Sequence, residues 1–176
     1  MVFTPETYRL RAKEHCPNNE LPVLIYRDCL PLPLSEEKAA EFLEAHAWVK
    51  KGCWGHIGQR HFHPNTHECY GIFQGSSTLL LGCGHNDTTD GGLEVEVHAG
   101  DVVVLPAGTG HCSTKSSKDY KYIGVYPEGA PHWTNQLGKA PIDLEAFRNE
   151  IGHVEMPSQD PVNGVDGPLI LLWTRT

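Results

Sequence analysis

The stretch that decides the fold reads Gly55-His56-Ile57-Gly58-Gln59-Arg60-His61-Phe62-His63-Pro64-Asn65-Thr66-His67-Glu68-Cys69-Tyr70-Gly71-Ile72-Phe73-Gln74-Gly75. Four histidines and a glutamate lie within thirteen residues of it, from His56 to Glu68. Imidazole and carboxylate groups together form the ligand set of iron, nickel, copper, zinc and manganese ions. The stretch therefore predicts most of a metal site, and we expect a distant histidine, His111, to complete it.

Strand alternation sorts these residues by the direction of their side chains. His61 and His63 are two positions apart, so on a strand they face the same way. Glu68 follows His63 by an odd spacing, but Pro64-Asn65-Thr66 predicts a turn, after which Glu68 can begin a new strand that faces inward again. On that reading His67 faces away from the metal.

Two motifs resemble the pair that marks the cupin superfamily. The first is Gly55-x5-His61-x-His63-x4-Glu68-x6-Gly75, and the second, about 24 residues later, is Gly100-x5-Pro106-x-Gly108-x2-His111. The second motif departs from the family at Lys115, where cupins have an asparagine that is not a ligand. The resemblance covers roughly residues 50–127.

The cupin resemblance implies a mainly β, single-domain fold: a conical antiparallel β-barrel, or jelly roll, with a few short flanking helices. Carried over by position, it implies His61, His63, Glu68 and His111 as metal ligands. Some cupins place the third ligand one residue earlier, which would be His67. The spacing to Gly75 favours Glu68, and the all-histidine alternative stays open.

The rest of the chain is expected to wrap this core as one domain over residues 1–176. An N-terminal arm and helix occupy residues 1–50, and a C-terminal loop, helix and strand occupy 128–176. The tail segments Tyr126-Pro127-Glu128-Gly129 and Asp160–Leu169, with Trp173, resemble the small YjlB-like cupin subfamily. That resemblance adds no activity.

Local patterns predict the individual elements. We expect an edge strand over Leu21–Tyr26, a helix from Ser35 to about Val49, and a short helix from Asp143 to Ile151. The expected strands are Cys53–Ile57, Arg60–His63, Glu68–Phe73, Ser77–Leu81, Leu93–His98, Val102–Leu105, His111–Ser113, Tyr120–Tyr126 and Leu169–Trp173. Residues 84–92 are expected to form a hairpin loop.

Composition and charge limit the partners. The net charge of −8 disfavours nucleic acid and anionic membranes, which need clustered Lys and Arg. The six cysteines form no CxxC pair and no secretory segment follows Met1, so we expect reduced thiols and a cytoplasmic protein. The partner would be a small-molecule substrate, and the proline-rich N-terminus and sheet edges are compatible with a homodimer.

Three functions are compatible with a metal inside a barrel. The favoured one is an oxidoreductase, a dioxygenase-type oxygenase using Fe²⁺, with Zn²⁺, Ni²⁺, Mn²⁺ and Cu²⁺ as alternative metals. The second is a redox-neutral isomerase or lyase in which a pocket residue moves a proton; the candidates are Tyr70, Tyr122 and His56. The third is a non-catalytic metal- or ligand-binding protein. A structural zinc ranks lower because such sites are usually richer in cysteine.

The expected substrate pocket follows from the same alternation. Residues that flank the first motif, or share the inward parity of Glu68 on its own or a later strand, would line it. They are Trp54, Gln59, Tyr70, Ile72, Tyr122 and Tyr126.

Overall fold

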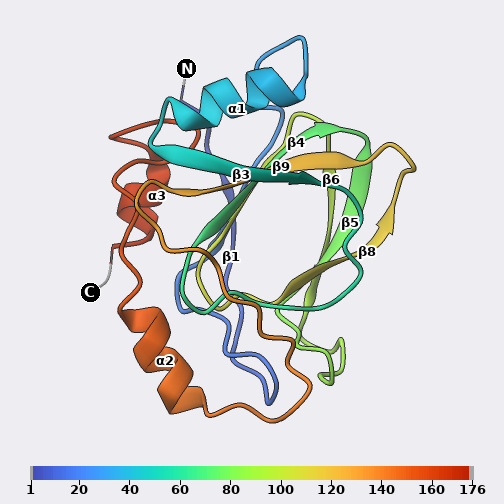
Figure 1. The fold of residues 1–176 in the computed structure, drawn as a ribbon, viewed down its shortest axis with the longest axis vertical. Helices are drawn as coiled ribbons and strands as arrows, with labels where there is room; N and C mark the ends of the chain where they lie inside the picture. Colours follow the sequence, from blue (N-terminus) through green and yellow to red (C-terminus); the bar gives the residue numbers. More distant parts are fainter. Residues whose placement is uncertain (1, 175–176) are drawn as a thin grey trace.

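The computed structural model describes residues 2–174 of the chain. Two antiparallel sheets face each other (Figure 1): the larger has the strand order β1-β2-β7-β4-β9-β3, and the smaller has the order β6-β5-β8. The strands are β1 (Glu6–Tyr8), β2 (Val23–Tyr26), β3 (Trp48–Trp54), β4 (Glu68–Gln74), β5 (Ser76–Leu81), β6 (Leu93–His98), β7 (Val102–Leu105), β8 (His111–Ser116) and β9 (Lys121–Pro127). The predicted mainly β, jelly-roll fold is confirmed.

Strand β7 consists of four apolar residues, and all four are buried. Val103 and Leu105 belong to the cluster between the two sheets, together with residues of β2, β4, β5 and β6. Val102 and Val104 belong to a second cluster on the outer face of the larger sheet. Both faces of β7 are therefore covered, and each fully buried side chain contributes about 1.5–3 kcal/mol.

The outer cluster is closed by helices. Helix α1 (Glu36–Glu44) packs on β3, β9 and β4 (Figure 1). Ser35 caps it as predicted, accepting a hydrogen bond from the Lys38 N–H at 3.1 Å. The helix ends at Glu44, however, and not near Val49. Ala47 adopts a left-handed φ of 61°, which ends the helical path, and Trp48 already begins β3.

At the N-terminal side, the predicted edge strand is an interior one. Strand β2 lies between β7 and β1, and the latter pairs Glu6 with Ile25 and Tyr8 with Val23. Strand β1 carries no alternation of its own, so its pairing was not predicted. Pro22 stands just before β2 and therefore removes no hydrogen bond from the ladder.

Of the two elements predicted near the C-terminus, the helix is confirmed and the strand is wrong. Helix α2 (Leu144–Gly152) begins after Asp143, whose Oδ1 accepts from the Ala146 N–H at 3.0 Å. The predicted strand Leu169–Trp173 is instead helix α3 (Pro168–Leu172). Pro168 suits the first helical turn because its missing N–H is not needed there. A short apolar run does not by itself distinguish a strand from a helix.

Two further observations concern the whole described chain. No helix within residues 2–174 has the length and apolarity needed to cross a membrane. Over the same residues the six cysteines are free thiols.

Candidate metal centre

Backbone pairing brings the two sequence motifs together at one end of the space between the sheets. The predicted strand Arg60–His63 forms only isolated bridges, His61 with His111 and Phe62 with Gln136. The His61 N–H donates to the His111 carbonyl at 3.2 Å, and the His111 N–H donates back at 2.9 Å. These two bonds fix the histidines of separate motifs side by side at the start of β8.

The candidate ligands converge on one point. Ligand-capable nitrogens of His61, His63 and His111 all lie within 4.8 Å of one another. Glu68, the first residue of β4, places Oε2 3.1 Å from His63 Nε2 and 3.2 Å from His111 Nε2. His63, Glu68 and His111 are buried, and His61 is partly exposed.

The backbone fixes which nitrogen of each imidazole faces the others. The Nδ1 atom of His61 lies 2.7 Å from the Gln59 carbonyl oxygen, that of His63 lies 3.0 Å from Thr134, and that of His111 lies 2.9 Å from Thr109. A carbonyl oxygen only accepts, so each Nδ1 must carry the proton and donate it. In the neutral rings each Nε2 is therefore a lone pair, the arrangement typical of metal-ligating histidines.

Two buried acceptor atoms of the candidate ligands have no hydrogen-bond donor among residues 2–174. Within the described residues, Glu68 Oε2 and His111 Nε2 are buried and satisfy no hydrogen-bond geometry. A lone pair facing a carboxylate is repulsive, and an unsatisfied buried polar group costs about 1–3 kcal/mol. A divalent cation at this point would satisfy both atoms, so the residues present fit a metal.

The electrostatics favour a neutral His61 and an ionised Glu68. Burial, together with the neighbouring His111, lowers the pKa of His61 to about 3. Burial alone would raise the pKa of Glu68, but His111 and His63 outweigh it and the pKa is lowered. Burial opposes a charge on His63, yet Glu68 raises its pKa. Without a metal, a proton on His63 would pair with Glu68, and a bound cation replaces that proton.

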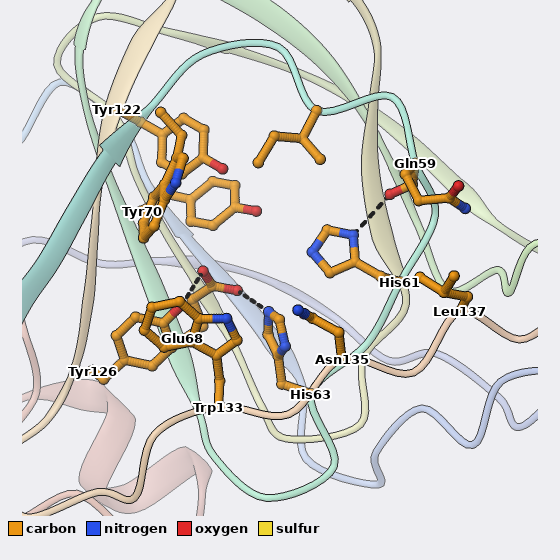
Figure 2. A pocket seen from close by; sticks show the side chains of 12 residues that line it. Gln59, His61, His63, Glu68, Tyr70, Tyr122, Tyr126, Trp133, Asn135 and Leu137 are labelled. Carbon is orange, nitrogen blue, oxygen red and sulfur yellow. Dashed lines mark hydrogen bonds and ion pairs between the residues drawn. The ribbon is translucent and has the colours of Figure 1, made fainter.

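A tyrosine orients the carboxylate. The Tyr126 hydroxyl donates to Glu68 Oε1 at 2.8 Å, which leaves Oε2 for the imidazole cluster. Tyr126 is itself stacked on Trp133, with ring centroids 4.8 Å apart and planes 7° apart. Tyr126 is therefore a positioning residue for the predicted ligand Glu68 (Figure 2).

We expect Tyr126→Phe to weaken metal affinity about 10- to 100-fold, because second-sphere hydrogen bonds hold ligand geometry. Titration of metal-free protein against a chromophoric chelator measures the affinity. Tyr120→Phe is the matched control, since its hydroxyl makes no hydrogen bond to Glu68. Equal affinities in the two variants would contradict the positioning role.

Three of the candidate ligands, His61, His63 and Glu68, line a cavity of about 380 Å³. Figure 2 shows the side chains around it, with the Tyr70 and Tyr122 hydroxyls directed into the same space as Glu68, His61 and His63. Five of the predicted pocket residues line the cavity: Trp54, Gln59, Tyr70, Tyr122 and Tyr126.

Two predicted residues lie elsewhere. Ile72 has the expected inward parity and is fully buried in the cluster between the sheets, but it does not line the cavity. His56 is exposed, and its Nδ1 lies 2.9 Å from Ser116 Oγ on β8. His56 is therefore not placed to serve as an acid or base in this cavity.

Comparison with known proteins finds sequence similarity to one protein known by name alone. No protein-family model matches it. YjlB of Bacillus subtilis (strain 168), described as an uncharacterized protein, is 27% identical over 171 residues, which cover 97% of each protein. This chain is similar to YjlB over nearly its whole length.

Solved structures with a similar chain path are more distant. RmlC from Streptococcus suis gives a TM-score of 0.38 at 14% identity, covering 76% of this chain and 74% of RmlC. The 11S globulin from Wrightia tinctoria gives a TM-score of 0.37 at 10% identity, covering 73% of this chain. The chain spans only 27% of that globulin's length. At these TM-scores neither structure bears on function.

The cavity also includes residues that were not predicted. Ile57 comes from the first motif, and Trp133, Asn135 and Leu137 come from the loop that follows β9. That loop is held by Asn65, whose Nδ2 donates to the His132 carbonyl at 2.9 Å and whose Oδ1 accepts from the Thr134 N–H at 3.0 Å. The sequence signal for this was weak: a tryptophan within a proline-rich loop.

His67 occupies a different environment from the other motif histidines. It is fully buried, and its Nδ1 accepts from the Ala107 N–H at 2.9 Å. Its ring lies 4.8 Å from the Trp173 ring. It lies outside both the three-histidine cluster and the cavity lining, consistent with the predicted outward direction.

Proposed function

We propose that this chain is a metal-dependent enzyme acting on a small organic molecule, with an oxygenase reaction favoured. The observation that supports it is the convergence of three imidazole Nε2 atoms and the Glu68 carboxylate at the wall of a cavity. His61, His63, Glu68 and His111 would hold the metal. A redox-active metal such as Fe²⁺ supplies electron transfer between an organic substrate and dioxygen.

The protein's own groups would bind and orient the substrate. Tyr70 and Tyr122 stack at 4.0 Å. Burial raises the pKa of both, and the Glu68 charge adds to the effect, so both remain protonated and can donate hydrogen bonds. Trp133 and Leu137 form the loop side of the cavity and limit access of water.

The tyrosine pair also favours a second candidate, a redox-neutral lyase or isomerase. In that reaction Tyr70 or Tyr122 would donate a proton to a substrate oxygen or carbon, and the metal would act as a Lewis acid. Both proposed reactions use the same cavity and ligands. Only the oxygenase consumes dioxygen, so a measurement of oxygen uptake distinguishes the two.

The test begins with protein purified without added metal. Stoichiometric iron together with substrate-dependent oxygen uptake supports the oxygenase. Zinc or nickel with turnover but no uptake transfers support to the lyase or isomerase. Failure to bind a stoichiometric metal, even after reconstitution, would overturn both and leave a non-catalytic protein.

Removal of the metal should also lower thermal stability. His111 belongs to β8 of the smaller sheet, whereas Glu68 belongs to β4 of the larger sheet, so a shared metal would join the sheets. A ligand at a hundred times its Kd stabilises the native state by about 2.7 kcal/mol. We expect a chelator to lower Tm by roughly 5–10 °C, measured by calorimetry, and metal addition to restore it. An unchanged Tm would contradict metal bridging.

A further inference from the structure

Two glycines of the larger sheet make room for the indole ring of Trp54, which forms part of the cavity wall. Gly52 of β3 and Gly124 of β9 face each other in the strand pair. A Cβ atom on either glycine would collide with the Trp54 ring. Because these two paired positions have no side chains, the indole of Trp54 can pack directly against the backbone of the sheet. In this position Trp54 lines the cavity.

Other aromatic rings continue this wall. Trp133, from the loop after β9, meets Trp54 edge to face with centroids 5.9 Å apart and planes at 89°. Tyr122 lies 6.1 Å from Trp54 and stacks on Tyr70. Aromatic groups from β3, β4, β9 and the loop therefore line the space beside the candidate metal centre. Figure 2 labels Tyr70, Tyr122 and Trp133 among them.

Within residues 2–174, the cavity lining has neutral polar groups and no lysine or arginine side chain. Among the described residues that line it, Gln59 and Asn135 supply amides, and Glu68 is the one acidic group. Arg60, next to His61, directs its guanidinium away, to the carbonyl oxygens of Asp87 at 2.8 Å and Gly84 at 3.3 Å. A phosphate group would find no arginine, lysine or helix N-terminus of the kind that binds it.

We propose that the substrate is a small ring compound that carries one metal-chelating oxygen group and no phosphate. This rests on the proposed function, because the metal receives the chelating group. A divalent metal with one carboxylate ligand carries a net positive charge, which suits a monoanionic chelator. The ring packs against Trp54 and Trp133, and the amides bind remaining polar atoms. A volume of 380 Å³ is near the lower end of ligand pockets, roughly 300–1,000 Å³.

Two chelators with the same head group test the ring requirement. The full chain is loaded with Zn²⁺, which has no redox chemistry, and titrated calorimetrically with benzohydroxamate and acetohydroxamate. Benzohydroxamate should bind about tenfold more tightly or better, because its ring is buried against aromatic side chains. Trp133→Ala should remove most of that preference, measured as the ratio of the two affinities in the same zinc-loaded variant, and Trp133→Phe should keep it.

Three results would overturn the substrate class. They are equal affinities of the two hydroxamates, tighter binding of phenyl phosphate than of benzohydroxamate, and tighter binding of tetramethylammonium, which would indicate a cation cage. Zinc content is measured in the same samples. Zinc-loaded protein without a ring preference refutes the substrate class alone, whereas protein that binds no zinc and no other divalent metal refutes the proposed function as well.

Discussion

His111→Ala is expected to abolish stoichiometric metal binding and to leave a folded, soluble protein. His111 is held by a reciprocal backbone pair with His61, and its Nε2 faces Glu68 Oε2 at 3.2 Å. Loss of second-sphere contacts already costs about 10- to 100-fold in metal affinity, so loss of a direct ligand should cost more than about 100-fold. Metal analysis after dialysis, followed by competitive titration, measures the change, and circular dichroism reports the fold.

His67→Ala is the control for this experiment and should show the opposite behaviour. It removes the acceptor for the buried Ala107 N–H, a loss of about 1–3 kcal/mol, and the contact with Trp173. Metal content should stay nearly intact while Tm falls. Unchanged metal content in the His111 variant refutes the proposed ligand set. A large loss in the His67 variant favours the all-histidine alternative.

Asp160→Ala is expected to cause the largest loss of stability. Asp160 is fully buried and accepts hydrogen bonds from the N–H groups of Val162, Asn163 and Leu169 at 2.8, 2.9 and 3.0 Å. It also accepts from the Tyr26 hydroxyl on β2 at 2.5 Å. Alanine would leave these donors unsatisfied, at a cost of about 4 kcal/mol or more. For a chain of this size we expect Tm to fall by roughly 8–16 °C.

Thermal melts of the Asp160 variant are best compared with Asp166→Ala, which makes the same chemical change six positions later at an exposed site. That control should melt close to the wild-type Tm. If the two variants melt alike, Asp160 does not hold the C-terminal segment on β2. Metal content should stay near the wild-type value in both, because neither residue belongs to the candidate metal centre.

The convergence of the candidate ligands could be predicted because its determinants are local. His61 and His63 lie two positions apart in an extended segment that forms isolated bridges, and a turn at Pro64 precedes Glu68 at the start of β4. The motif glycines supply backbone shapes that other residues avoid: Gly75 has a φ of 68° and Gly108 a φ of 85°. The same parity placed Tyr70 and Tyr122 in the cavity.

The other features of the fold and cavity depend on contacts between segments that are distant in the sequence. Hydrophobic periodicity does not predict such contacts. Trp133 and Asn135 reach the cavity because their loop pairs with Phe62 through Gln136 and is held by Asn65. Ile72 has the correct parity, but its depth depends on how far the cavity extends along the strand. Helix α3 is held by the bond from the Leu169 N–H to Asp160 and by the Trp173 indole, which donates to the Pro22 carbonyl at 2.9 Å.

The backbone of the loop after β9 supports the candidate ligand His63, and three side chains of the loop line the cavity. His63 Nδ1 lies 3.0 Å from the Thr134 carbonyl oxygen, a group that any residue would present. Trp133, Asn135 and Leu137 meet the cavity with their side chains. Substitutions at these three positions can therefore change which molecule fits while the support of His63 persists. Homologues that share the ligand spacing can consequently diverge in substrate, and exchange of this loop between them offers a route to transplant specificity.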